Sequence, residues 1–207
     1  MSETKSEETA GILEQVFVRV TGMILKPAKN FLLAANDSVT FTVLYVLILI
    51  GVFGLLYSIY LSRFVLFMMS TAFMLIIAWM LVQMIVSFLL NTVWLHLWVY
   101  AFGGRKGLKN TLRIVAYSMT PMLLIGWLMP VGMIIAVPWS FILEILGIRE
   151  LHEVSTTRAI LAAILPVVVM LGILIGYLML TDPKGFAQLV ATLSGTGRAG
   201  SPSVYSY

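Results

Sequence analysis

The sequence predicts an all-α membrane protein, a polytopic bundle of five transmembrane helices preceded by an interfacial amphipathic segment. Of the 207 residues, 60% are hydrophobic and only 11% are charged, whereas soluble domains are about 25% charged. Uncharged runs of the length that crosses a bilayer, about 20 residues, recur along the chain. Basic residues gather in the short segments between these runs, as in multi-pass membrane proteins. This composition excludes a soluble enzyme. In a membrane protein basic residues first report orientation, so the net charge of +4 does not indicate a nucleic acid partner.

The N-terminal part is more polar than the rest. We expect residues 1–10 to be disordered and cytoplasmic. In residues 11–38, apolar side chains recur at the spacing of one helical face, and Pro27 must interrupt the helix. Two short amphipathic helices are therefore predicted. They either lie in the membrane interface, with Lys26 and Lys29 facing anionic lipid headgroups, or pack on the bundle as a soluble cap.

The predicted membrane domain covers residues 39–181 and begins with the uncharged run Val39 to Tyr60. The next run, Phe64 to Phe102, contains 39 residues without Asp, Glu, Lys, Arg, Gly or Pro. As one helix it would be roughly 58 Å long, and two crossings would need a turn for which the run has no turn-forming residue. We expect one long helix that crosses once.

The basic residues support the single crossing. The densest cluster of them is a loop that contains Arg105, Lys106, Lys109 and Arg113. With one crossing this loop is cytoplasmic, as are ten of the 13 Lys and Arg residues, whereas two crossings leave a minority inside. The positive-inside rule thus predicts a cytoplasmic N-terminus and a C-terminus on the opposite side.

Two 16-residue apolar runs follow, 114–129 and 133–148. They predict a hairpin whose arms either both span the bilayer or return from mid-membrane depth as a re-entrant loop. Pro121 and Pro138 lie inside the arms, and in lipid such kinks persist only where neighbouring groups satisfy the freed carbonyls. The hairpin should therefore be interior to the bundle.

The last predicted span, Ala159 to Leu180, contains Gly172 and Gly176 at GxxxG spacing, a candidate helix-packing face. This spacing is common in apolar sequence, so chance or ordinary bundle packing also explains it. Residues 182–207 form a C-terminal tail, and its Gly- and Ser-rich part, residues 195–207, is expected to be disordered.

Ionisable groups inside spans are costly and mark candidate functional sites. We expect His96, Tyr117 and Glu144 at similar depth on the cytoplasmic side, where they could converge with Arg113 as the counter-charge. In a structural interpretation, Glu144 pairs with Arg113 or Arg149 and locks the hairpin to its neighbour. In a functional one, the cluster serves transport or a proton relay.

Two further polar residues lie deeper on the long predicted helix. Gln83 and Asn91 are eight residues apart and so share roughly one helical face. We expect both side chains to form hydrogen bonds with other helices.

No constellation typical of an enzyme is present. The sequence has no cysteine, and His96 and His152 cannot by themselves build a metal site. His152 is expected in a short exposed loop without a nucleophile elbow, and the HExxH, phosphate-loop and GxGxxG motifs are absent. We expect no enzymatic activity, no cofactor and no metal.

Four stretches resemble the Yip domain family, the Ypt-interacting-protein membrane proteins, and the resemblance extends from Ile24 to Leu180. They are ILKPAKNF (24–31), GGRKGLKNTLRIVAYSMTP (103–121), LEILGIRELHEVSTTRA (143–159) and the order of hydrophobic runs between them. The resemblance implies five spans, a cytosolic N-terminus and a C-terminus on the opposite side.

Eukaryotic members of this family reside in ER and Golgi membranes and associate with one another and with prenylated Rab GTPases. The present chain lacks their long cytosolic N-terminal region and their Asp-Leu-Tyr-Gly-Pro motif, which puts GTPase binding in doubt. It is more similar to the short prokaryotic members, which implies a prokaryotic plasma membrane.

The leading hypothesis is a non-enzymatic membrane scaffold or adaptor. It would associate with itself or with other membrane proteins, within membrane lipids, through the GxxxG helix and the cytoplasmic basic loop. The alternative is a small permease or channel that uses the polar cluster in the cytoplasmic leaflet.

Overall fold

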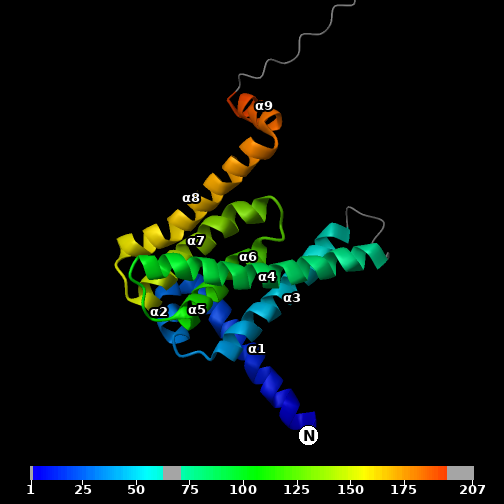
Figure 1. The fold of residues 1–207 in the computed structure, drawn as a ribbon. Helices are drawn as coiled ribbons and strands as arrows, with labels where there is room; N and C mark the ends of the chain where they lie inside the picture. Colours follow the sequence, from blue (N-terminus) through cyan, green and yellow to red (C-terminus); the bar gives the residue numbers. More distant parts are fainter. Residues whose placement is uncertain (1, 63–70, 195–207) are drawn as a thin grey trace, which may run out of the picture. The chain divides into compact units, whose positions relative to one another are not determined.

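The computed structural model describes residues 2–62 and 71–194, and in these ranges the chain forms helices and no strand (Figure 1). The prediction of an all-α protein is confirmed. The helices are α1 (Ser2–Leu25), α2 (Pro27–Ala34), α3 (Val39–Ser62), α4 (Thr71–Ala101), α5 (Leu108–Ser118), α6 (Thr120–Ile125), α7 (Val131–His152), α8 (Thr156–Thr181) and α9 (Pro183–Leu193). They form two compact units, Met1–Ile164 and Leu165–Tyr207, which we describe separately.

Four helices in the described ranges are long and apolar enough to cross a membrane. They cover Val39–Leu61, Phe73–Ala101, Val131–His152 and Thr156–Thr181, with hydropathies of 2.1 to 2.8. This confirms an integral membrane protein.

The predicted count of five spans is not confirmed. Residues 114–129 form the end of α5 and the six-residue helix α6, which meet at Met119. Pro121 explains this break, because proline has no N–H to donate and its ring clashes with the carbonyl four residues earlier. The freed carbonyl of Tyr117 accepts a hydrogen bond of 2.6 Å from the Thr120 hydroxyl. A backbone carbonyl inside a membrane needs such a partner, because lipid offers no hydrogen-bond donor.

The predicted long helix is uninterrupted over the 31 residues of α4, although its predicted start at Phe64 lies outside the described residues. It packs against α3. A Cβ atom on Gly54 of α3 would lie 2.7 Å from the Leu81 side chain of α4, so the absence of a side chain at Gly54 allows this close approach.

Both ends of the described chain are more helical than expected. Residues 2–10, which belong to the stretch expected to be disordered, are part of α1. The break at Pro27 is confirmed. In the C-terminal unit, Asp182 caps α9 by accepting a hydrogen bond of 2.9 Å from the Gly185 N–H, so the tail begins as a helix. The predicted disorder of residues 195–207 lies outside the described residues.

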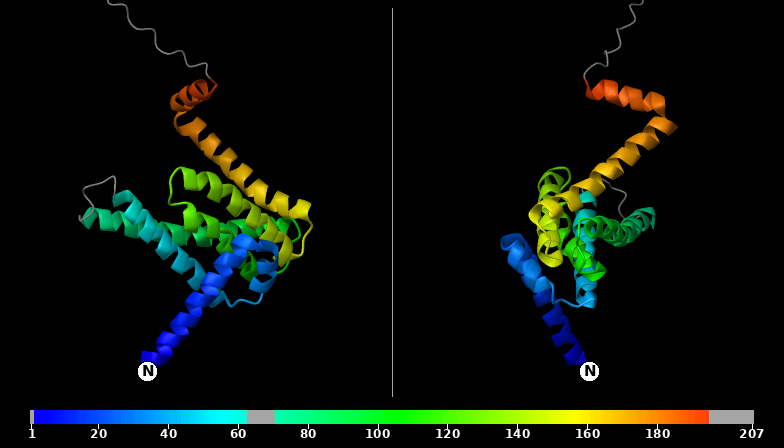
Figure 2. Two further views of the ribbon diagram at one scale, coloured as in Figure 1. Left: turned by 180° about the vertical axis from the view of Figure 1, so that it is seen from behind. Right: turned by 60° about the vertical axis from the view of Figure 1, so that its left-hand side comes forward.

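The core of the N-terminal unit is built around α5, which packs against α3, α4 and α7. Six of its eleven residues are buried. Helix α7 runs back along α5 and α6, as Figure 2 shows, and also contacts α2. Within the predicted hairpin α5 is largely buried, whereas α7 keeps an exposed apolar side that includes Val131, Ile134 and Ile142, so the prediction of an interior hairpin is not confirmed for both arms.

Gly147 of α7 provides a test of this packing. A Cβ atom there would lie 2.9 Å from the Phe31 ring of α2 and 3.1 Å from Ile114 of α5. We predict that Gly147→Ala lowers the free energy of unfolding by about 1–3 kcal/mol, the usual cost of overpacking, measured as loss of thermal stability in detergent. The matched control is Gly51→Ala, because a Cβ at Gly51 meets no atom within 4 Å. Equal stability of the two variants would contradict the close packing of α7.

Candidate functional site

Polar side chains from three parts of the chain meet at Asp37, in the turn between α2 and α3. The Arg19 guanidinium on α1 lies 2.7 Å from the Asp37 carboxylate, and the Tyr117 hydroxyl on α5 donates a hydrogen bond to the other carboxylate oxygen. Arg113, also on α5, donates two hydrogen bonds to the backbone carbonyl of Asp37. We call Arg19, Asp37, Arg113 and Tyr117 the Asp37 cluster.

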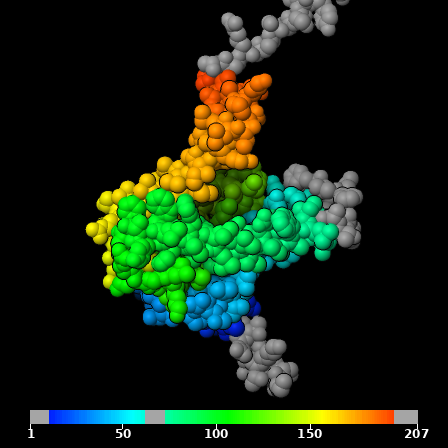
Figure 3. Space-filling view, in the orientation of Figure 1, coloured from blue at the N-terminus to red at the C-terminus, as the bar shows by residue number. Residues whose placement is uncertain are grey.

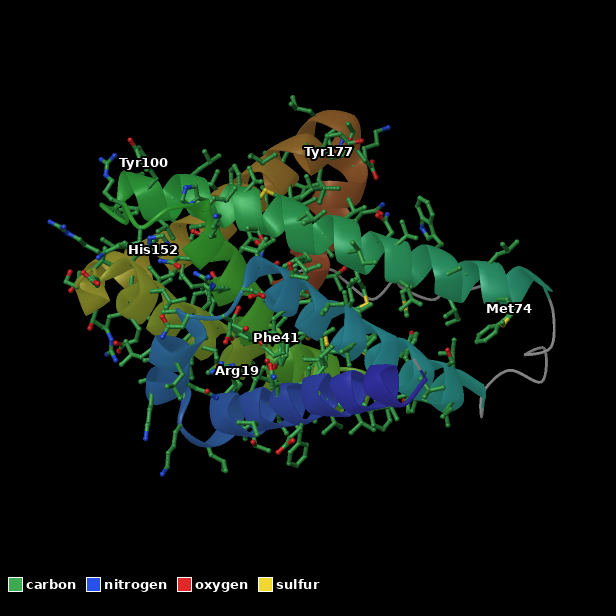
Figure 4. All side chains as sticks on the ribbon, turned by 90° about the horizontal axis from the view of Figure 1, so that it is seen from below. Arg19, Phe41, Met74, Tyr100, His152 and Tyr177 are labelled. Atoms are coloured by element: carbon green, nitrogen blue, oxygen red, sulfur yellow. The ribbon has the colours of Figure 1, made fainter. Side chains whose placement is uncertain are left out.

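The turn itself frees Asp37 for this role. Helix α3 is capped by the next residue, since the Ser38 hydroxyl accepts a hydrogen bond of 3.0 Å from the Phe41 N–H. Asp37 is therefore not needed as the cap, and its carboxylate can face α1 and α5. Figure 4 shows Arg19 near Phe41, where α1 passes the start of α3.

Arg19 is held in place by α2. Its guanidinium donates a hydrogen bond of 2.8 Å to the Asn30 side-chain carbonyl, and the Asn30 amide donates one of 3.2 Å back to the Arg19 carbonyl. Gly22 makes room for Asn30, because a Cβ there would lie 1.7 Å from the Asn30 amide nitrogen. Asn30 thus holds the Arg19 side chain in the position in which it contacts Asp37.

The Asp37 cluster is largely shielded from solvent. The side chains of Arg19 and Asp37 are each 14% exposed, so their attraction is weakly screened. The Tyr117 side chain is fully buried, and its hydroxyl donates its hydrogen bond to the Asp37 carboxylate. Its ring also lies 5.7 Å from the Arg19 guanidinium, at the distance of a cation–π contact.

A second polar group joins α4, α5 and α7. It consists of His96, Thr111 and His152, and we call it the histidine group. The Thr111 hydroxyl lies 2.7 Å from Nδ1 of His96 and 3.0 Å from Nε2 of His152. The expectation that His152 lies in an exposed loop is wrong: α7 continues to this residue, and its side chain is only 3% exposed. Figure 4 shows His152 where α7 passes the end of α4.

The structure separates the predicted polar cluster. It brings Tyr117 and Arg113 together at Asp37, whereas His96 belongs to the histidine group. Glu144 is half-buried on α7 and forms no ion pair or hydrogen bond with the described residues. Arg149, one of its expected partners, instead pairs with Glu150 at 2.6 Å.

Asp37 and Arg19 are not among the predicted site residues, because both lie outside the uncharged apolar runs in which ionisable groups mark candidate sites. Asp37 lies just before the first span, in an Asn-Asp-Ser sequence typical of a turn or a helix cap. The sequence did contain one signal for Asp37. It is an acidic residue at the boundary of a span, in a chain with several arginines that have no acidic residue beside them in the sequence.

Two adjoining grooves flank the cluster. One has a volume of about 370 Å³ and reaches Arg19 and Asp37, and the other, of about 310 Å³, reaches Lys26 and Lys29 between α1 and α2. A third pocket, of about 240 Å³, has an entirely apolar lining from α1, α6 and α7. His96, Tyr117 and Glu144 line none of these three cavities.

The predicted basic loop is exposed, and two of its side chains have partners. The Arg105 guanidinium lies 3.8 Å from the centre of the Tyr100 ring, and Lys106 pairs with Glu153 at 2.8 Å. Lys109 is exposed. No group of three metal-ligating side chains occurs within residues 2–62 and 71–194.

The predicted packing face, Gly172 and Gly176, lies in the C-terminal unit on α8. A Cβ atom added to either glycine would meet no described atom within 4 Å. Both positions therefore face open space within this unit.

Removing the charge of Asp37 tests the cluster. We predict that Asp37→Asn lowers the free energy of unfolding by about 3 kcal/mol, because it leaves a buried guanidinium without its counter-charge. In a double-mutant cycle with Arg19→Met, the two losses should not add. The measurement is thermal unfolding in detergent.

The control is the exposed ion pair of Lys106 and Glu153. Lys106→Met should change the stability by less than about 1 kcal/mol. If Asp37→Asn proved as mild as this control, the Asp37 cluster would not be a structural tie.

Comparison with known proteins identifies the family. The family model of the Yip1 domain matches residues 21–177. The matched range includes Asp37, Arg113 and Tyr117 of the Asp37 cluster but begins after Arg19, and it includes His96, Thr111, His152 and both glycines of the α8 face. No curated protein matches the chain significantly, and no solved structure does so.

Proposed function

The chain belongs to the Yip1 domain family, and from this membership we propose that it is a non-enzymatic membrane scaffold or adaptor. In this proposal it associates with itself or with other membrane proteins. Its role is the organisation of a membrane, and no chemical step is required. A prokaryotic plasma membrane is the proposed location.

The observation that carries this proposal is where the polar groups of the interior are used. Arg19, Asp37, Arg113 and Tyr117 bond to one another and to backbone carbonyls, so they hold helices together. The three cavities described above touch none of His96, Tyr117 and Glu144. An interior of this kind favours a rigid body with contact surfaces over a permeation route.

The proposed topology keeps the N-terminus in the cytoplasm and the C-terminus on the opposite side. Helices α5 and α6 together act as the broken first arm of the hairpin, and α7 is the returning arm. A hairpin of this form returns to the side on which it began, whether its arms span fully or not. The basic loop and the segment after α7 are then both cytoplasmic, in agreement with the positive-inside rule.

Helices α1 and α2 are proposed to contact membrane lipids. Their outward side chains are strongly apolar, and Phe17, Leu25 and Leu32 are 68%, 76% and 54% exposed. Lys26, in the junction between α1 and α2, and Lys29, on α2, are also exposed. Apolar side chains beside basic ones suit the boundary between acyl chains and anionic headgroups.

The α8 face gives the proposal its first test. We predict that replacing Gly172 and Gly176 with Leu weakens self-association, because bulky side chains prevent close helix approach. Crosslinking in native membranes measures this association. Gly51→Leu serves as the control, since Gly51 of α3 also has no atom within 4 Å of an added Cβ. Unchanged oligomers in the double variant would count against α8 as a contact.

A small permease or channel is the alternative function. Glu144 favours it, because a half-buried carboxyl group in a candidate span, with no partner among residues 2–62 and 71–194, suits a transport pathway. Glu144→Gln separates the two functions. In a scaffold, this change should preserve association and raise or maintain thermal stability, because it removes an uncompensated charge. In a permease, it should abolish flux of ions or protons into proteoliposomes while expression and assembly stay normal.

A further inference from the structure

Three polar side chains form a row along one side of α4. They are Gln83, Ser87 and Asn91, spaced four residues apart, so each lies about one turn from the next on the same face. All three are exposed, and none forms a hydrogen bond with another described residue. We call these three residues the polar row.

The polar row lies well inside a candidate span. The described part of this span in α4 is Phe73–Ala101, and each residue of the row is at least ten residues, about 15 Å along the helix, from either end of this range. In the hydrocarbon core of a bilayer no water is present to pair with an amide, so Gln83 and Asn91 need a protein partner.

On the buried side of α4, the polar side chain of Thr92 has a hydrogen-bond partner within its own helix. Its hydroxyl donates a hydrogen bond of 2.8 Å to the Phe88 carbonyl, one turn back in the same helix. A carboxamide carries two N–H donors and a carbonyl acceptor, and a single carbonyl of its own helix cannot satisfy them all. Gln83 and Asn91 therefore require another chain segment.

Helix α4 is also the least covered of the candidate spans. Only 11% of its most apolar stretch is buried, compared with 22% to 39% in the other three candidate spans. Figure 3 shows α4, in teal to green, open to view along its length, with no other part of the N-terminal unit laid over it from this side.

We infer that the polar row is the surface through which α4 contacts α4 of a second copy of this chain. All copies enter the membrane with the same orientation, so two parallel α4 helices bring each polar residue to the same depth as its counterpart. A carboxamide can donate to and accept from an identical carboxamide. A different partner would need polar residues at the same three depths, whereas a second copy supplies them by identity.

The order in which small and long side chains follow one another in the polar row suits a two-fold contact. The small Ser87 lies at the centre, where two helices that cross come closest, and the longer Gln83 and Asn91 lie one turn to either side. In a two-fold interface each residue meets the same patch on its partner. This inference rests on the proposed self-association and adds a contact surface separate from that on α8.

Cysteine crosslinking tests the inference directly, since the sequence has no cysteine of its own. Ser87→Cys and Leu89→Cys are compared in proteoliposomes after oxidation with copper phenanthroline. Leu89 is 50% exposed and lies almost opposite Ser87 on the helix at nearly the same depth. Covalent dimers from Ser87→Cys alone support the polar row, whereas equal yields, or dimers from Leu89→Cys alone, overturn it.

A second measurement tests the hydrogen bonds. Asn91→Leu should raise the dimer dissociation constant in lipid about 3- to 30-fold, the range expected for a hydrogen bond between membrane helices, and Asn91→Gln should restore association. Energy transfer between labelled copies on lipid dilution reports the constant. The apolar control is Val93→Leu, which leaves the polar row intact.

The outcomes also separate this inference from the proposed function. Wild-type protein that remains monomeric at every lipid dilution overturns the polar row together with the self-association in the proposed function, whereas association with other membrane proteins is judged separately by co-purification. Association that responds to the Gly172 and Gly176 variants but not to Asn91→Leu overturns the polar row alone. Failure of Ser87→Cys to crosslink between copies, as when the segment 165–193 of the same chain covers the row, overturns it as well.

Discussion

The ion pair of Arg19 and Asp37 is the interaction on which the N-terminal unit depends. It joins α1 to the turn before α3, and through Arg113 and Tyr117 it joins both to α5 at the centre of the core. Removal of either charge leaves the other buried without compensation, so these elements must pack together. The amphipathic segment is consequently fixed to the bundle on one side, while its opposite side carries exposed apolar and basic side chains.

Much of the fold could be predicted because it depends on local properties. The length of an apolar run predicts a span, and Pro27 and Pro121 end helices because of their own covalent geometry. A fifth span is not confirmed, since Pro121 divides residues 114–129 and leaves only short helices there. The Asp37 cluster was missed for a different reason. Which arginine meets which carboxylate depends on how α1 and α5 fold back onto the turn, and their separation in sequence does not reveal it.

Glycine illustrates the same limit. Gly22 and Gly147 leave room for buried side chains of neighbouring helices, whereas Gly51 and Gly172 meet no atom within 4 Å of an added Cβ. In the sequence all four are glycines in or beside apolar runs. Only the position of neighbouring helices distinguishes a glycine that the core requires from one that leaves a surface open for association.

The break at Pro121 also fixes the direction of a hydrogen-bond chain. Because the single proton of the Thr120 hydroxyl is donated to the Tyr117 carbonyl, the Tyr45 hydroxyl, 2.7 Å away, must act as the donor to Thr120. This order has no equivalent reversed arrangement, because a carbonyl has no proton to donate. The hydroxyl of Thr111 is different: it lies between two imidazoles, and either ring can be the donor.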